Sequence, residues 1–168
     1  MKRDNAPSGY SRKQIALHWI IAALIIAQFV LHDPIVAAWN ARMEGVEPEF
    51  GLLVATHVFG GIFILLLAIW RLRIRFSRGA PPLPEKEHPL LKAAAHITHG
   101  ALYALMILMP LSGMATWFGE SQLADTIHTT LKIPLLLLFF AHVGGALVQQ
   151  FVFKTGLIKR MMRADETT

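Results

Sequence analysis

The chain has 168 residues, of which 54% are hydrophobic and 16% are charged. Soluble domains usually contain ~45–50% apolar and ~25% charged residues, so this composition argues against an ordinary soluble protein. The absence of cysteine excludes disulfide frameworks, cysteine-ligated zinc, iron–sulfur clusters, covalently attached haem and thiol catalysis. The formal net charge is +5. A basic protein can bind nucleic acid, so the positions of the Lys and Arg residues along the chain decide whether this partner is expected.

Four uncharged stretches are each long enough to cross a membrane, which takes ~20 mainly apolar residues as a helix. They cover residues 14–32, 50–70, 93–119 and 133–153. The sequence therefore predicts an all-α integral membrane protein, a four-helix up-and-down bundle forming one domain over residues 1–168. The helices are expected at about residues 12–32, 50–75, 90–118 and 122–156, with a disordered tail at residues 164–168.

A signal peptide and a soluble four-helix bundle are the two other interpretations of these stretches. A signal peptide has an apolar run of only ~7–15 residues followed by a small-residue cleavage site, and the first stretch is longer and lacks a clear site. A soluble four-helix bundle needs a polar face on every helix. Runs such as IIAALIIAQFVL and IPLLLLFFAH are apolar on all sides, so four membrane spans remain the prediction.

The positive charges are segregated along the chain. All Lys and Arg residues except Arg42 and Lys132 lie in the N-terminal segment, in residues 71–92, or after residue 153. Because cytoplasmic loops of membrane proteins carry an excess of Lys and Arg, we expect a multi-pass membrane protein with both termini in the cytoplasm. The basic charge is then a topology signal, and no nucleic-acid partner is expected. Segments 33–49 and 120–132 become the two outer loops.

Histidine is the residue type that points to function. Ionisable side chains inside membrane helices are costly and mark functional sites by default. Of the eight histidines, only His32 and His88 fall at the margins of the spans or outside them, where we expect solvated loop side chains. The others are His18, His57, His96, His99, His128 and His142.

His128 and His142 are 14 residues apart on one predicted helix. This spacing brings them to within ~40° of the same helix face and separates them by ~21 Å along the axis. That distance is too great for one metal ion and indicates two sites at different membrane depths. Antiparallel neighbours would supply the second ligands, which pairs His57 with His128 near the outer side and His18 with His142 near the inner side.

Two axial histidines in an apolar, cysteine-free bundle fit b-type haem better than zinc. Haem presents a large apolar face to its pocket, whereas zinc takes four compact ligands. Gly60 and Gly61 follow His57 by three and four residues, so small surface lies beside this histidine on the same helix face. Gly145 likewise follows His142 by three residues. Close helix packing is the alternative explanation for these glycines.

His96 and His99 lie at the inner end of their helix at i, i+3 spacing, and so on one face. Their depth leaves either of them open as the partner of His142. The other roles considered for them are contacts with haem propionates, a proton path and a quinone pocket.

Four segments of the chain resemble the bacterial cytochrome b561 family, the small di-haem membrane cytochromes that include the superoxide:ubiquinone oxidoreductase. They are YSRKQIALHW, THVFGGIFILLLAIWRLRIR, AHITHGALYALMILMPLSG and the histidine pair His128 and His142 of the last predicted helix. The resemblance covers roughly residues 10–160, and its specific parts are YSR-x-Q-I-x-x-HW and the histidine pair. The chain differs at Ile127 and Thr129, where the family commonly has Trp and Glu.

The resemblance implies two b-type haems in a four-helix bundle of the bacterial inner membrane, with ubiquinone as electron acceptor or donor. It also implies that His96 and His99 are paired histidines that do not bind iron. The residues that it makes axial haem ligands are His18, His57, His128 and His142.

Polar residues near the inner histidines are candidates for binding cofactors. Arg12 and Arg71 lie at the inner rim, where guanidinium groups can pair with haem propionates; anchoring of the helix ends is the alternative role. Gln149 is seven residues past His142, which places it within ~20° of the same face and about two turns deeper. We expect Gln149 and Arg71 to contact a quinone, unless Gln149 only bonds to a neighbouring helix.

On the outer side, Lys132 is one turn from His128 and is the candidate catalytic residue. Its charge can draw a small anion such as superoxide toward the haem edge. The acidic residues of the outer loops oppose such attraction, so a periplasmic redox protein is the rival partner.

Three functions follow from these residues. The leading one is electron transfer across the bilayer between membrane quinone and a periplasmic donor or acceptor, in one version superoxide oxidation coupled to ubiquinone reduction. The second is a haem-bearing anchor subunit that exchanges electrons with a separate periplasmic redox enzyme. The third, a histidine-lined cation transporter, is disfavoured because the spans contain no acidic residue.

Overall fold

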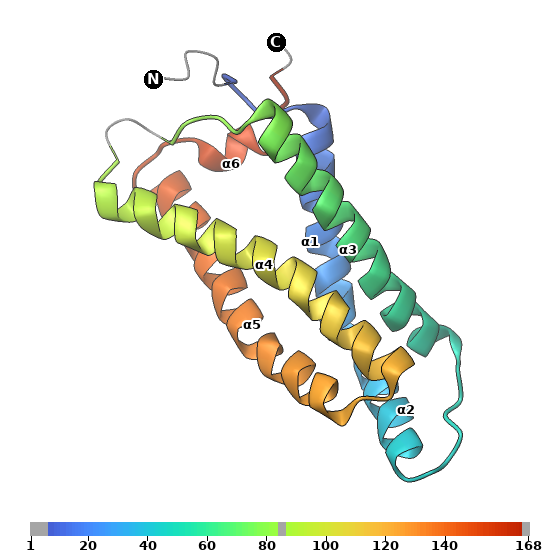
Figure 1. Cartoon of the computed structure of the whole chain (residues 1–168). Helices are drawn as coiled ribbons and strands as arrows, with labels where there is room; N and C mark the ends of the chain where they lie inside the picture. The colour runs from blue at the N-terminus through green and yellow to red at the C-terminus, as the bar shows by residue number, and fades with distance from the viewer. Residues whose placement is uncertain (1–6, 84–86, 166–168) are drawn as a thin grey trace.

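The computed structural model describes residues 7–83 and 87–165, and these residues form helices and no strand. Four long helices make an up-and-down bundle (Figure 1). They are α1 (Arg12–Val30), α3 (Leu52–Arg78), α4 (Pro89–Gly119) and α5 (Gln122–Phe151). All four are long and apolar enough to cross a membrane, which confirms the predicted all-α membrane fold. The short helices α2 (Asp33–Met43) and α6 (Leu157–Arg160) lie at opposite ends of the bundle.

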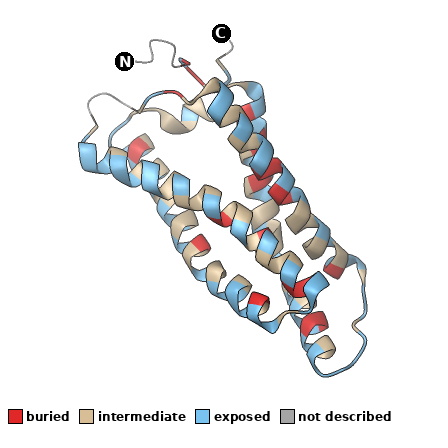
Figure 2. Cartoon of the chain, viewed as in Figure 1, coloured by how far each residue is buried: buried red, intermediate tan, exposed pale blue. Residues whose placement is uncertain are grey.

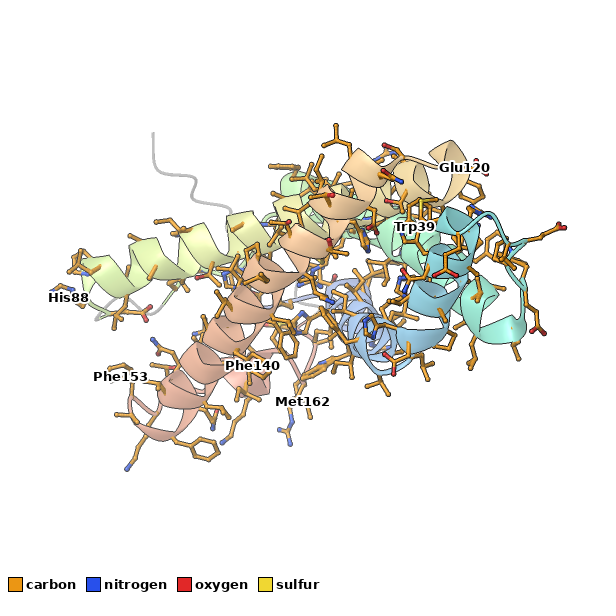
Figure 3. All side chains as sticks on the ribbon, turned by 90° about the horizontal axis from the view of Figure 1, so that it is seen from below. Trp39, His88, Glu120, Phe140, Phe153 and Met162 are labelled. Carbon is orange, nitrogen blue, oxygen red and sulfur yellow. The ribbon has the colours of Figure 1, made fainter. Side chains whose placement is uncertain are left out.

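The two ends of the bundle differ in what they contain. Both ends of the chain and α6 lie at one end, here called the terminal end, and α2 lies at the other, here called the far end (Figure 1). A second view has His88 and Phe153 at the terminal end, well away from Trp39 and Glu120 at the far end (Figure 3). Histidines close to either end therefore belong to separate sites.

Helix packing leaves one side of the bundle more open than the others. The main pairings are α1 with α3, α3 with α4 and α4 with α5, and α2 packs on α3. At the terminal end the C-terminal segment links α5 to α1, because the Trp19 indole nitrogen donates a hydrogen bond of 2.8 Å to the Met161 carbonyl. The space between α1 and α5 is thus bounded by α3 and α4 behind and by this segment at one end.

The outward faces of the long helices are apolar and exposed (Figure 2). Leu52 is 81% exposed. Many other large apolar side chains are also exposed, among them Phe76, Ile97, Leu137, Phe140 and Phe151. Soluble monomers rarely expose contiguous apolar surface on this scale. In a bilayer these apolar faces contact lipid tails instead of water.

Residues 33–43, expected to belong to an outer loop, instead form helix α2. Pro34 occupies its first turn, a position that proline tolerates because no backbone donor is needed there. Ala38 is buried with Val54 of α3 and Trp117 of α4. Tertiary packing of this one apolar face stabilises a helix whose sequence alone gives only a weak signal.

The C-terminal tail also differs from expectation in the part that the structure describes. The Asp165 backbone nitrogen donates to the Tyr10 carbonyl at 3.0 Å, and its carboxylate accepts a 2.7 Å hydrogen bond from the Ser8 hydroxyl. Arg78 donates to the Asp165 carbonyl at 3.2 Å. Asp165 is thus bonded to both the N-terminal segment and α3. Residues 166–168 of the expected disordered tail lie outside the described residues.

Candidate functional site

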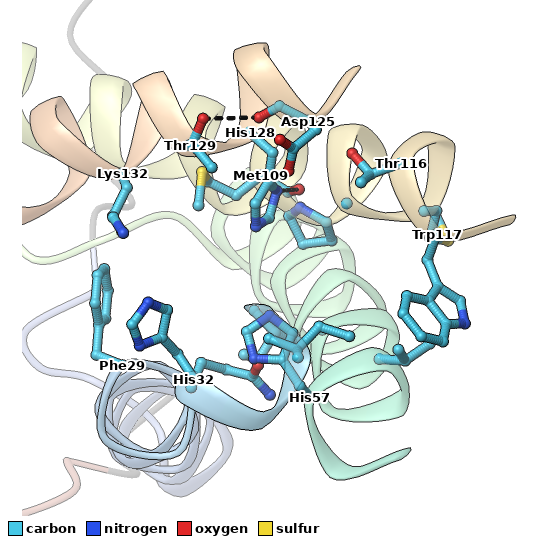
Figure 4. A pocket seen from close by; sticks show the side chains of 18 of the residues that line it. Phe29, His32, His57, Met109, Thr116, Trp117, Asp125, His128, Thr129 and Lys132 are labelled. Carbon is cyan, nitrogen blue, oxygen red and sulfur yellow. Dashed lines mark hydrogen bonds between the residues drawn. The ribbon is translucent and has the colours of Figure 1, made fainter. Parts of the chain in front are cut away.

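The far half of the bundle encloses a cavity of about 390 Å³, here called the far cavity. All four long helices and α2 contribute to its walls, and most of its lining is apolar. His57 of α3 and His128 of α5 lie on opposite walls (Figure 4). The structure thus brings together the two histidines that the sequence pairs near the outer side.

His128 lies within the span because α5 begins early. The Ser121 hydroxyl accepts a 3.2 Å hydrogen bond from the Ala124 backbone nitrogen and caps the helix. The helix then continues through Pro134 to Phe151. His128 and His142 are therefore on one continuous helix, as their spacing requires.

The ring of His128 is held by α4. Its Nδ1 lies 2.9 Å from the Met109 carbonyl and 3.2 Å from the Ser112 hydroxyl. A proton on Nδ1 donated to that carbonyl leaves Nε2 as the nitrogen with a free lone pair, which is the usual way in which a metal-binding histidine is oriented. A Cβ added at Gly113 would come within 3.0 Å of the His128 ring, so this glycine provides the room for it.

His57 differs from His128 in its hydrogen bonding. Its Nδ1 is buried and has no hydrogen-bond partner among the residues that the structure describes. Buried polar atoms are nearly always paired, so an unpaired nitrogen of this kind calls for an explanation such as a bound ligand. One turn further along α3, Gly61 lines the same cavity, and a Cβ added there would meet nothing within 4 Å. Close helix packing therefore does not account for Gly61.

The terminal half brings three histidines together, here called the terminal histidine cluster. The His142 ring centroid is 6.0 Å from that of His18 and 5.0 Å from that of His99. His99 Nδ1 lies 2.6 Å from the Ala95 carbonyl of its own helix. His96, in contrast, is exposed. Sequence alone left His96 and His99 equivalent, and their different surroundings are decided by the position of α4 against α5.

Arg71 is directed into the terminal half. It donates to the Gln14 carbonyl at 2.7 Å and to the Tyr103 hydroxyl at 3.2 Å, and it is close enough to His18 and His142 for electrostatic interaction. The Arg12 side chain is exposed in the first turn of α1.

Gln149 is buried, and both ends of its amide are bonded to protein. Its nitrogen donates to the Glu87 carboxylate, and its oxygen accepts a 3.0 Å hydrogen bond from the Thr155 hydroxyl. These bonds tie α5 to the segment before α4 and to the chain after α5.

Lys132 and His32 both line the far cavity, from α5 and from the residues after α1 (Figure 4). His32 lies in the connection between α1 and α2, as expected for a loop residue, and its side chain also faces the far cavity. Its position carried a sequence signal: His32 follows His18 by 14 residues, the spacing that also separates His128 from His142. The other basic residue of the far end, Arg42, instead donates to the Trp117 carbonyl at 2.7 Å and lies 4.2 Å from that ring.

Sequence reasoning also missed residues that support the site. Ser11 and Gln14 form a capping box at the start of α1, and the Gln14 amide donates to the Gly79 carbonyl at 2.9 Å. The S-x-x-Q spacing is a recognised signature of such a box. Ser112, by contrast, gave no signal, because its contact with the His128 ring depends on how α4 packs against α5.

Comparison with known proteins identifies the family. The model described as prokaryotic cytochrome b561 matches residues 9–164. The chain belongs to the prokaryotic cytochrome b561 family. It is 37% identical to a cytochrome b562 of Cereibacter sphaeroides, over 92% of this chain and 96% of that protein. It is also 28% identical to a probable superoxide oxidase CybB of Yersinia pestis, over 91% and 95%, and 25% identical to cytochrome b561 homolog 1 of Escherichia coli, over 91% and 96%.

Family membership implies a b-type haem and a role in membrane electron transfer. The residues of the far cavity fit such a group. Its lining is mainly apolar, His57 and His128 face it from opposite walls, and Gly61 leaves space beside His57. The orphaned Nδ1 of His57 adds a buried polar atom in the same region.

Proposed function

We propose that this membrane protein transfers electrons across the bilayer through two b-type haems, one in the far cavity and one at the terminal histidine cluster. The observation that carries the proposal is the presence of two separate sets of inward histidines, one in the mainly apolar far cavity and one in the terminal half beside Arg71. Bound haem supplies reversible one-electron chemistry at its iron, and the protein sets the access and the potential.

In the far cavity, His57 and His128 are the proposed axial ligands. The hydrogen bond from the His128 Nδ1 to Met109 supports this role, because it orients the ring and leaves Nε2 for iron. The Nδ1 side of the ring is thus held by α4 through Met109 and Ser112, and the Nε2 side stays free.

At the terminal end, His18 and His142 are the proposed ligands. These residues belong to α1 and α5, and their ring centroids are 6.0 Å apart. Together they would hold the iron of a haem between these two helices. His99 keeps a supporting role, since its Nδ1 is already bonded within its own helix.

The orientation in the membrane follows from charge. The terminal end carries nearly all Lys and Arg residues, which supports a cytoplasmic location for both termini and a periplasmic location for the far end. The far cavity then faces the periplasmic side, and the terminal histidine cluster faces the cytoplasmic side.

We place a quinone site near the terminal histidine cluster, with Arg71 as its main polar contact. A quinone carbonyl needs a hydrogen-bond donor, and the Arg71 guanidinium is directed to this region. Arg71 and Arg12 are also the proposed contacts for the propionates of the haem at the terminal histidine cluster. Gln149 was the other candidate for the quinone. The bonds of its amide to Glu87 and Thr155 favour a structural role for it instead.

At the far end, superoxide is the proposed electron donor. Its support is the likeness to a relative named as a probable superoxide oxidase and the cationic Lys132, which lines the cavity beside His128. Electron transfer with a periplasmic redox protein or enzyme subunit is the second candidate, favoured by the acidic residues of segment 33–49. Both candidates use the same two haems and differ only in the partner.

Haem content of single variants tests the ligand assignment. Replacing His57 or His128 with alanine should remove the far haem and leave the terminal one, and replacing His18 or His142 should do the reverse. Haem stoichiometry and redox titration of the purified variants measure this. Retention of two haems in His18→Ala, with loss of one in His99→Ala, would move the terminal ligand to α4.

Rapid mixing of the oxidised protein with superoxide tests the donor. We expect fast haem reduction, slower in Lys132→Glu, followed by electron transfer to added ubiquinone. Because a charge reversal opposes the anion along its whole approach, the effect should weaken as ionic strength rises. No reduction above the background of spontaneous dismutation would leave the periplasmic redox protein as the partner.

A further inference from the structure

We propose that His32 and Lys132 form a carboxylate-binding site at the wall of the far cavity and that it holds the propionates of the haem bound there. This inference deepens the proposed function and rests on it, since it assumes a haem in the far cavity. The observation that carries it is a pair of polar side chains on opposite walls of an otherwise mainly apolar cavity (Figure 4).

Lys132 is a half-buried cation without a protein counterion. No hydrogen bond or ion pair joins it to any residue in the ranges 7–83 and 87–165. Asp125 also lines the cavity, but it is seven residues away on the same helix, ~10 Å along the axis. Partial removal of an ammonium group from water is costly unless an anion compensates it. Lys132 therefore has the property expected of a residue that binds an anionic ligand.

His32 completes the site from the α1 side. Its Nδ1 lies 2.9 Å from the Asp33 carboxylate, which orients the ring. The other ring nitrogen has no hydrogen-bond partner among the described residues. His32 is also close enough to His57 for electrostatic interaction, so the proposed site lies beside the proposed iron ligands.

Arg42 does not compete for this role. Its guanidinium is already bonded to the Trp117 carbonyl and packed against the Trp117 ring. Haem carries two carboxylates on one edge of an otherwise apolar ring, and this edge has to lie against the polar part of the wall. His32 and Lys132 provide that part, and charge-assisted hydrogen bonds to carboxylates are among the stronger ones in proteins.

Infrared spectroscopy of the haem-loaded protein tests the site directly. Haem labelled with carbon-13 at the propionate carboxyls identifies the carboxylate bands in reduced-minus-oxidised difference spectra. Bands that disappear in His57→Ala belong to the far haem. We expect these bands to shift in Lys132→Ala and in His32→Gln, and to return toward their original position in Lys132→Arg.

A matched control removes an equal charge elsewhere. Lys154→Ala, at the exposed terminal end, should leave the far-haem bands unmoved. Release of the far haem to excess apomyoglobin gives a second measurement. Loss of one charged hydrogen bond, ~1.5 kcal/mol, corresponds to about tenfold faster release in Lys132→Ala.

The outcomes separate this inference from the function on which it rests. Unmoved far-haem bands in both Lys132→Ala and His32→Gln would overturn the propionate site, even if Lys132→Ala slowed reduction by superoxide. That combination would assign Lys132 to the substrate alone. A wild-type protein without a far haem would overturn the proposed function itself.

Discussion

Filling the far cavity should displace the haem proposed to lie there. Gly61 lines this cavity near the middle of α3, and a Cβ added at Gly61 would meet no protein atom within 4 Å. Gly61→Leu therefore introduces a side chain whose Cβ has open space around it on the side of the cavity. In a protein that binds nothing in this cavity, the change should stabilise the helix by roughly 0.5–1 kcal/mol, because glycine is a poor helix former.

The same substitution has the opposite effect when haem occupies the cavity. Truncation of one leucine in a core can leave a cavity of about 150 Å³, so a leucine takes up a comparable volume. This is more than a third of the 390 Å³ available. A rigid planar group cannot shrink to share the remainder, and we expect Gly61→Leu to retain only the terminal haem.

Haem content per chain, measured by the pyridine haemochrome method together with a redox titration, checks this prediction. Leu66→Phe is the matched control, since Leu66 lies on the same helix but is 58% exposed on its outer face; it should keep both haems. Two haems with unchanged potentials in Gly61→Leu would refute the assignment of the far cavity as a haem site. Higher thermal stability of Gly61→Leu with an unchanged haem absorption spectrum would also refute this assignment.

Three further predictions concern the terminal end. Gln14→Ala removes one partner of the capping box and a bond to a loop carbonyl, so the free energy of unfolding should fall by about 1–2 kcal/mol; an unfolding midpoint equal to that of Lys13→Ala would contradict this. A truncation that removes Asp165 breaks its backbone bond to Tyr10, and limited proteolysis should then cut the N-terminal segment faster; unchanged cleavage would argue against this link. A reporter fused after Lys159 should give a cytoplasmic signal, and a periplasmic signal would reverse the proposed topology.

The chain's own pattern of residues determined the fold class and the approximate position of the membrane spans. Uncharged runs of sufficient length, separated by charged loops, admit few structures other than spanning helices, because backbone groups in lipid must be bonded internally. The 14-residue spacing of His128 and His142 likewise placed two candidate sites at different depths, since helix geometry relates spacing to position. These inferences use only local periodicity and the properties of the bilayer.

Other features depended on contacts between segments that are distant in the chain. Helix α2 forms because Ala38 packs against Val54 and Trp117, and no local signal specifies those partners. The approach of His99 to His142, the support of His128 by α4 and the use of Gln149 as a structural amide arise in the same way. Helix periodicity determines which side chains share a face of a helix. Only the packing of the helices against one another decides which of these side chains come into contact.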